Sequence, residues 1–127
     1  FGANRVKLAA FGLDAQVATI NRRAAELARE AAGEARLVAG AVGPLGVRLE
    51  PYGPTSRDEA RAAFREQVAG LVAGGADCII RETFADLEEL EQAILGSRDA
   101  APAVPIIAQA TVGPDLRTAY GATPEDI

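Results

Sequence analysis

The stretch ADCIIRETFADLEELEQAI, residues 76–94, contains an apolar run followed by a helical pattern, and this pair of elements decides the fold class. The run from Asp77 to Thr83 is short and mostly apolar, which is typical of a strand that is buried on both faces. The segment from Leu87 to about Ser97 has the spacing of a helix. The strand nevertheless ends on Arg81 and Glu82, and charged side chains are seldom buried. The pattern predicts an α/β fold, and the two charges need an explanation of their own.

Strands and helices alternate along the chain. Apolar runs typical of strands cover 36–42, 77–83 and 104–112, and helical patterns cover 14–32, about 55–73 and 87 to about 97. The final TPEDI, with Pro124 in its first turn, resembles the start of another helix. This order predicts parallel strands joined by right-handed crossovers. Two architectures fit, an open doubly wound sheet and part of a (β/α)8 barrel, and both place chemistry at the carboxyl ends of the strands.

Several residues predict where the helices begin and end. We expect Asp14 to cap the first long helix and Gly33 to end it. Ser56 and Glu59 have the spacing of a capping box, and Asp86 is the expected cap of the last helix. The first helix carries an apolar stripe that we expect to be buried, made of Val17, Ile20, Ala24, Leu27, Ala28 and Ala31. The acidic cluster on the last helix predicts a solvated face, made of Glu88, Glu89 and Glu91.

Composition limits the classes of function. The chain has 127 residues, enough for one domain, and a net charge of −5 without any basic block, which argues against nucleic acid as a partner. No apolar run has the length of about 18 residues that a membrane span needs. The single cysteine predicts a reducing, cytoplasmic compartment. Histidine is absent, so a zinc site within this segment is not expected. The chain starts at Phe1 without a Met, and we expect an internal fragment of a longer protein.

Five sequence motifs occur in an order that resembles a known family. They are FGANRVKLA, VAGAVGPLG, DEARAAFREQ, IIRETFADLEEL and IIAQATV. Together they resemble the homocysteine S-methyltransferase domain over nearly the whole chain. The resemblance implies a (β/α)8 TIM barrel, with residues 1–127 as one partial domain from the end of strand 2 through the start of helix 5. GPLGVRLEPYG and AYGATPED look most like bacterial bifunctional proteins that also carry a methylenetetrahydrofolate reductase domain, which implies FAD in that separate domain.

The resemblance also implies a reaction. In this family a methyl group moves to the thiolate of homocysteine and gives methionine, so the implied partners are homocysteine and a methyl donor. The family's zinc is held by three cysteines on later strands, and we expect those ligands outside this fragment. We therefore expect no metal ligand and no catalytic residue in residues 1–127, and no activity from the segment alone. The methyl donor and the oligomeric state are left open by the sequence.

The expected substrate site lies at the strand ends. Glu82 matches the family's glutamate that holds the amino group of homocysteine, and a carboxylate facing a cavity pairs well with an ammonium. Ala41 and Val42, between Gly40 and Gly43, match a region that contacts homocysteine, although a tight turn before Pro44 explains the small residues equally well. Gln109 and Thr111 point to one side of the last strand, either into the pocket or into a packing layer of the barrel.

Four other positions have competing explanations. Alternation places Arg81 opposite Glu82, towards the helices, where we expect it to snorkel or to pair with an acidic side chain. Cys78 is expected in the core rather than as a ligand. Asn4 is expected to cap a helix ahead of Arg5, with a contact to the active-site rim as the alternative. Leu116 replaces a family glycine, which puts the function of that loop in doubt.

Two rival interpretations are consistent with the pattern. One is a different (β/α)8 enzyme, for example one that binds a phosphate ester through glycine-rich loops late in the barrel. The other is a non-catalytic α/β module that associates through an open sheet edge.

Overall fold

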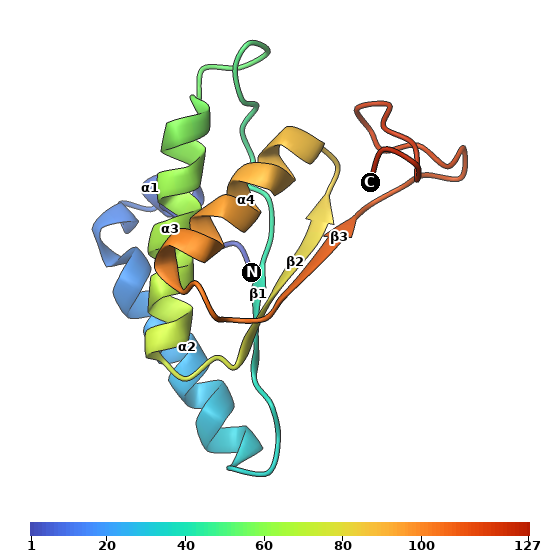
Figure 1. Cartoon of the computed structure of the whole chain (residues 1–127). Helices are drawn as coiled ribbons and strands as arrows, with labels where there is room; N and C mark the ends of the chain where they lie inside the picture. The colour runs from blue at the N-terminus through green and yellow to red at the C-terminus, as the bar shows by residue number, and fades with distance from the viewer.

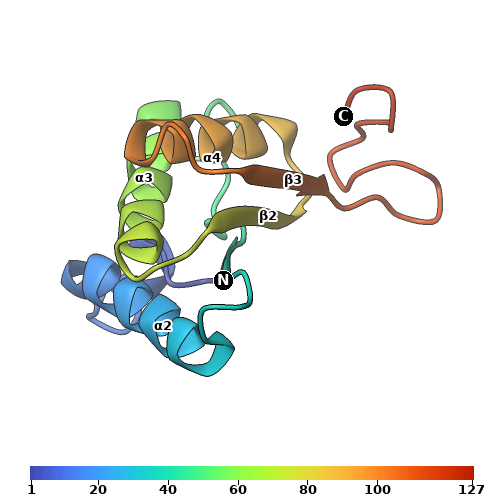
Figure 2. The same cartoon turned by 60° about the horizontal axis from the view of Figure 1, so that its bottom comes forward.

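One parallel sheet of three strands carries all the helices on one of its faces. A computed structural model describes residues 1–127. The elements follow in the order α1 (Arg5–Ala9), a 3-10 turn (Asp14–Gln16), α2 (Val17–Ala32), β1 (Ala39–Val42), α3 (Arg57–Ala73), β2 (Cys78–Phe84), α4 (Leu87–Ala100) and β3 (Ile106–Ala110). The strand order is β1-β2-β3, and both pairings are parallel. Figures 1 and 2 show α3 and α4 beside the sheet and α2 beyond α3. The predicted alternation of strands and helices is confirmed.

The arrangement is compatible with part of a (β/α)8 barrel. A doubly wound sheet has helices on both faces, whereas here the face of the sheet opposite α3 and α4, called the open face below, carries no helix. Three strands do not close a barrel, so these residues define only an arc of such a sheet. No helix of the structure combines the length and the hydropathy that crossing a bilayer would require.

Local capping signals set most helix ends. Ser56 Oγ accepts from Glu59 N at 3.2 Å while the Glu59 carboxylate accepts from Ser56 N at 2.8 Å, which confirms the capping box. Asp86 caps α4 by accepting from Glu88 N at 3.0 Å. Asn4 caps the short helix α1 by accepting from Lys7 N at 3.0 Å, as predicted.

Of three further predictions about the helices, one is confirmed and two are wrong. Asp14 does not cap α2, because it begins a 3-10 turn and the side chain forms no cap hydrogen bond. Gly33 does end α2, with φ 66°. The final TPEDI forms a turn in which Asp126 N donates to Thr123 O at 3.0 Å, not a helix.

The core lies between the sheet and helices α3 and α4. Its largest buried members come from β1 and β2, from α3 and α4, and from the loop after β1: Val42, Ile79, Phe84, Phe64, Val68, Leu71, Leu90, Leu45 and Leu49. The rings of Phe64 and Phe84 lie 5.9 Å apart between centroids. Burial of this apolar surface is the main term that stabilises the fold.

The first long helix packs against α3 and not against the sheet. Its buried residues are Val17, Asn21 and Ala25, whereas most of the predicted stripe is exposed; Leu27, for example, is 50% exposed. Glycines allow this close packing, because a Cβ at Gly70 would lie 2.8 Å from the carbonyl oxygen of Ala18. The prediction of the buried face of α2 is therefore wrong except at Val17 and, in part, at Ile20.

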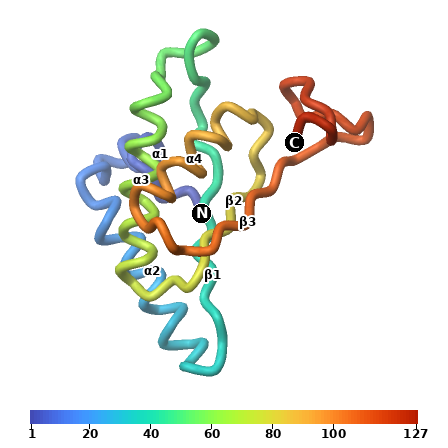
Figure 3. The backbone as a smooth tube through the Cα atoms, viewed as in Figure 1, coloured from blue at the N-terminus to red at the C-terminus, as the bar shows by residue number.

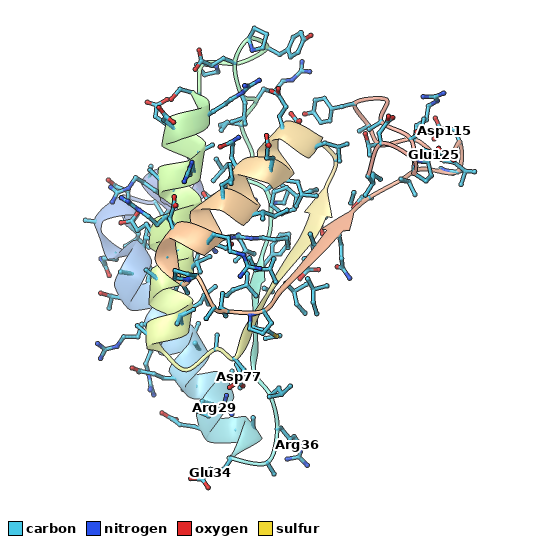
Figure 4. All side chains as sticks on the ribbon, viewed as in Figure 1. Arg29, Glu34, Arg36, Asp77, Asp115 and Glu125 are labelled. Atoms are coloured by element: carbon cyan, nitrogen blue, oxygen red, sulfur yellow. The ribbon has the colours of Figure 1, made fainter.

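The strands are shorter than or displaced from their predicted ranges. β1 begins at Ala39 rather than at residue 36, and β3 covers Ile106–Ala110 rather than 104–112. Directly before the start of β1, Val38 N donates to the carboxylate of Asp77 at 2.7 Å instead of to a neighbouring strand. The same carboxylate also binds Arg29 of α2. Figure 4 shows Arg29 and Asp77 facing one another at the amino end of the sheet.

Candidate functional site

The carboxyl ends of the three strands lie at one edge of the sheet. β1 ends at Val42, β2 at Phe84 and β3 at Ala110, and all three run in the same direction. The arrowheads of β2 and β3 point to the same side in Figure 1. Parallel strands followed by loops place functional side chains at this edge in both α/β architectures. The edge is therefore where a site has to be sought.

A β-bulge at the end of β2 decides which side chains face which side. Arg81 pairs with Ala108 and Phe84 pairs with Ala110, so Glu82 and Thr83 together occupy the place opposite Gln109. Thr83 has φ 69°, a conformation that a β-branched residue rarely adopts. The extra residue lets Arg81 and Phe84 both point into the core, while Glu82 is half-buried and Thr83 is exposed.

Arg81 points towards the helices, as alternation predicts, but it neither snorkels nor meets a carboxylate. The side chain is 0% exposed, and its Nη2 donates to Ala93 O at 2.7 Å and to Ser97 Oγ. The guanidinium carbon lies 5.2 Å from the centroid of the Phe64 ring. Burial lowers the pKa of Arg81 to about 9. Its role is therefore in the core of the protein, away from any substrate on the open face.

The structure places the five predicted substrate contacts on three adjacent strands and the loop after β3. Ala41 is half-buried and pairs with Ile80, on the same face of the sheet as Glu82. Val42 is 0% exposed and belongs to the core, so only its main chain is available to a ligand. Gln109 and Thr111 are exposed, and Thr111 N donates to Phe84 O at 2.7 Å.

The acidic cluster on α4 is not uniformly solvated. Glu88 and Glu91 are exposed, but Glu89 is only 6% exposed, and its Oε1 accepts from Leu45 N at 2.7 Å. Burial raises the pKa of Glu89 above its usual value. The prediction of a solvated face is therefore wrong at Glu89. Its hydrogen-bond partner, Leu45, lies 44 positions earlier in the sequence, so helical periodicity alone gave no signal.

The loop after β1 is fixed by contacts from the amino-terminal segment. Gly43 N donates to Phe1 O at 3.2 Å, and Asn4 Nδ2 donates to Pro44 O at 3.5 Å. A Cβ at Gly43 would collide with the Phe1 ring, so this position requires glycine for a close approach. Figure 3 shows the amino terminus beside β1. Asn4 thus caps α1 and also supports the loop that borders the strand ends.

A cleft of about 350 Å³ opens between the loops that follow β1 and β2. Its lining consists of Pro44, Gly46, Val47, Arg48, Thr83, Ala85, Asp86, Glu89 and Tyr120. Arg48 lies over two aromatic rings, 5.5 Å from the centroid of Tyr52 and 5.0 Å from that of Tyr120. Tyr120 belongs to the C-terminal segment, red in Figure 1, so the side chains of this segment and of the loop after β1 meet at the cleft. None of the five predicted contact residues lines it.

The largest cavity is elsewhere. It measures about 810 Å³ and is lined mainly by residues of α1 and α3, with the Arg5–Glu66 ion pair at its wall. No strand end contributes to it. A groove between helices that no strand end reaches is a weaker site candidate in an α/β fold than a smaller cleft at the strand ends.

The residues of this chain do not fit a zinc site. No three side chains among His, Cys, Asp and Glu lie close enough together to hold a metal ion. Cys78 begins β2, at the end of the sheet opposite the strand ends described above, and is half-buried. The prediction that Cys78 lies in the core is wrong, because alternation places it on the open face with Ile80 and Glu82. A zinc ion therefore has no ligand set among residues 1–127.

Comparison with known sequences decides the family. Residues 1–127 match the sequence model of homocysteine S-methyltransferase. The chain belongs to the homocysteine S-methyltransferase family. Membership of this family argues against an unrelated barrel enzyme that binds a phosphate ester.

Two methionine synthases are similar to this member of the homocysteine S-methyltransferase family. The chain is 34% identical over 122 residues to the methionine synthase of Mycobacterium tuberculosis, covering 88% of this chain and 10% of that protein. It is 35% identical over 106 residues to the methionine synthase of Mycobacterium leprae, covering 79% of this chain and 9% of that protein. The chain thus spans about a tenth of the length of these curated relatives.

Proposed function

We propose that this chain contributes the amino-group side of the homocysteine site to a methyltransferase that produces methionine. Family membership and the two methionine synthase relatives support methyl transfer to homocysteine. The observation that carries the assignment is the position of Glu82, a carboxylate on the open face at the carboxyl end of the central strand. Glu82 has a neighbouring strand on either side, so a ligand held there can also reach both of them.

The roles of the strand-end residues follow from their chemistry. The Glu82 carboxylate accepts hydrogen bonds from the ammonium group of homocysteine, a charge-assisted pair that is stronger than a neutral one. The main chain at Ala41 and Val42 lies on the adjacent strand, where small side chains leave room for a ligand. Gln109 and Thr111, exposed on and after β3, supply an amide and a hydroxyl on the other side. This chain binds and orients the substrate in the proposal.

Other parts of the proposal concern the whole protein. We place the domain over residues 1–127 as a partial barrel, and we expect the family's zinc ligands outside these residues. Zinc would convert the thiol of homocysteine to a thiolate. We expect a cytoplasmic protein, because its single cysteine suits a reducing compartment. The reductase domain and its FAD remain predictions from sequence resemblance.

The test measures homocysteine affinity by calorimetry in the whole protein and its Glu82→Ala variant. Loss of a charge-assisted hydrogen bond should weaken binding by about 1.5–3 kcal/mol, which corresponds to a dissociation constant higher by roughly 10- to 100-fold. The affinity of both proteins for the desamino analogue of homocysteine is measured as well, because this analogue has no ammonium group for Glu82 to bind. Its affinity should not fall in the variant.

Glu91→Ala is the matched control, because Glu91 is an exposed glutamate of α4. Unchanged homocysteine affinity in Glu82→Ala would remove Glu82 from the site. An equal loss for homocysteine and its desamino analogue would show that the variant disturbs the site in general, which would also contradict the assignment.

A further inference from the structure

Glu89 links two parts of the candidate site that are far apart in the sequence. It lies in the first turn of α4, directly after β2, and its Oε1 accepts from Leu45 N in the loop after β1 at 2.7 Å. Both residues are buried, with Leu45 at 0% and Glu89 at 6% exposure. Burying a carboxylate costs free energy unless it is hydrogen-bonded. The contact therefore needs an explanation beyond packing, since an apolar side chain would fill the same place at a lower cost.

Three consecutive residues of the loop after β1 are held by hydrogen bonds with two different segments. Gly43 N donates to Phe1 O, Pro44 O accepts from Asn4, and Leu45 N donates to Glu89. The first two contacts tie the loop to the amino-terminal segment. Of these three hydrogen bonds, only the one to Glu89 ties the loop to the unit formed by β2 and α4, which also carries Glu82.

A ligand that spans β1 and β2 depends on the spacing between the ends of these two strands. Main-chain groups at Ala41 and Val42 belong to β1, whereas Glu82 belongs to β2. Beyond the end of β1 the ladder of backbone hydrogen bonds between these strands stops, with Val42 pairing with Arg81. From that point on, the hydrogen bond between Leu45 and Glu89 holds the loop against the first turn of α4, the helix that follows β2. Glu89 also lines the cleft at the strand ends together with Pro44 and Thr83.

We propose that Glu89 is a positioning residue for homocysteine: by accepting the Leu45 N–H it holds the loop of residues 43–46 at the spacing from Glu82 that the substrate needs. Glu89 acts through Leu45 and does not touch the substrate. The inference rests on the proposed function, because it takes homocysteine to bind across the ends of β1 and β2.

The test compares Glu89→Ala, Glu89→Asp and Glu89→Gln in the whole protein. Alanine removes the acceptor, and aspartate withdraws it by one methylene, so both should weaken homocysteine binding by about tenfold or more. Glutamine keeps an acceptor oxygen at the same reach, and its affinity should stay within about threefold of the parent. Glu88→Ala is the control, because Glu88 is exposed on the same turn and pairs with Arg57.

Amide hydrogen exchange of the peptide that contains Leu45 provides a second readout. Exchange should accelerate in Glu89→Ala and Glu89→Asp and remain slow in Glu89→Gln. A merely structural role would lower the melting temperature of the variants without changing the homocysteine affinity of the folded fraction. If Glu89→Ala does not fold, Glu89→Asp carries the comparison.

The inference is overturned if a folded Glu89→Ala or Glu89→Asp variant binds homocysteine within twofold of the parent, or if Glu89→Gln is as impaired as Glu89→Ala. Glu82→Ala separates this failure from that of the proposed function. If Glu82→Ala weakens homocysteine binding and the Glu89 variants do not, only the positioning role is wrong. If Glu82→Ala leaves binding unchanged, the proposed site and the inference that rests on it both fail.

Discussion

The guanidinium of Arg81 lies over the Phe64 ring, 5.2 Å from its centroid, and no carboxylate accompanies it in the core. Only one of its terminal nitrogens is hydrogen-bonded; Nε and Nη1 are buried without a partner. Contact with the ring and two hydrogen bonds offset part of the cost of removing a cation from water. The lowered pKa of about 9 indicates that burial dominates.

Replacing Arg81 by methionine should therefore stabilise the protein. Methionine fills a similar length against Phe64, and Ala93 O keeps a partner because Ser97 Oγ donates to it at 2.8 Å. We expect the free energy of unfolding in urea to rise by about 1–3 kcal/mol at neutral pH. The lowered pKa means that the cost of the charged form is fully present below about pH 9 and shrinks as the pH rises above that value, so the advantage of methionine should shrink too.

Arg65→Met is the control, because Arg65 is an exposed arginine of α3. Its unfolding free energy should change by no more than about 0.5 kcal/mol. A clear loss of stability in Arg81→Met would mean that the hydrogen bonds and the aromatic contact outweigh desolvation.

Local signals in the sequence predicted the elements and several of their ends. The Ser56–Glu59 capping box and the Asp86 cap involve residues two or three positions apart, so the pattern contains all the information needed. Simple alternation along β2 also gave the direction of Arg81 correctly. These features depend on near neighbours in the chain, and sequence reasoning is strongest there.

Features that depend on tertiary contacts could not be predicted in the same way. Glu89 is buried and accepts a hydrogen bond from the distant Leu45 N, and the exposed stripe on α2, including Leu27, results from packing on α3 instead of on the sheet. No glycine in the sequence indicates the bulge, because the residue with positive φ is Thr83. Sequence reasoning therefore proposed Glu82 and its neighbours for the site but missed Glu89 and the cleft beside it.

Glycine at position 83 should stabilise β2 relative to alanine. Thr83 has φ 69°, which costs a residue with a Cβ roughly 1–2 kcal/mol and costs glycine little. Thr83→Gly should accordingly be more stable than Thr83→Ala by about 1 kcal/mol in urea unfolding, after allowance for the greater flexibility of glycine in the unfolded chain. Equal stability of the two variants would show that the backbone at Thr83 relaxes out of this conformation at little cost.

Glu89→Gln should change the pH dependence of stability. Burial raises the pKa of Glu89 from 4.5, so holding the carboxylate ionised in the folded state costs stability once the pH exceeds about that value. Below it the acid is protonated in both states and the cost disappears. The melting temperature of Glu89→Gln relative to the parent should therefore increase as the pH is raised from about 4 to 7.

Scans at several pH values test this expectation. Asp77 and Asp99 have lowered pKa values, mainly through hydrogen bonds from Val38 N and Arg61, and they destabilise both proteins equally in acid. Their contribution cancels in the difference between the two proteins. A difference that stays constant with pH would contradict the raised pKa.

Alanine at position 96 should destabilise the contact between α3 and α4. A Cβ at Gly96 would lie 2.6 Å from the carbonyl oxygen of Arg61 and 3.1 Å from Phe64 Cβ, and backbone cannot move aside easily. Overpacking of this kind costs about 1–3 kcal/mol, which exceeds the gain of up to about 1 kcal/mol from the better helix propensity of alanine. Thermal unfolding measures the loss, and Gly2→Ala, where the nearest atom is a side-chain carbon at 3.5 Å, is the control.

β2 has one residue more than β3 over the stretch where the sheet ends. Side chains on the open face of this stretch can change in evolution without disturbing the packing of the core. Deleting Thr83 would remove the bulge and leave Glu82 alone opposite Gln109, so Phe84 would still pair with Ala110 and face Phe64. Substitutions on the open face likewise leave the ring contact untouched, whereas deleting a residue in the regular part of β2, between Cys78 and Arg81, would shift the alternation by one and exchange the two faces there. We therefore expect evolution to tolerate loss of a residue at the bulge, residues 82–83, better than a change of length within the regular part of β2.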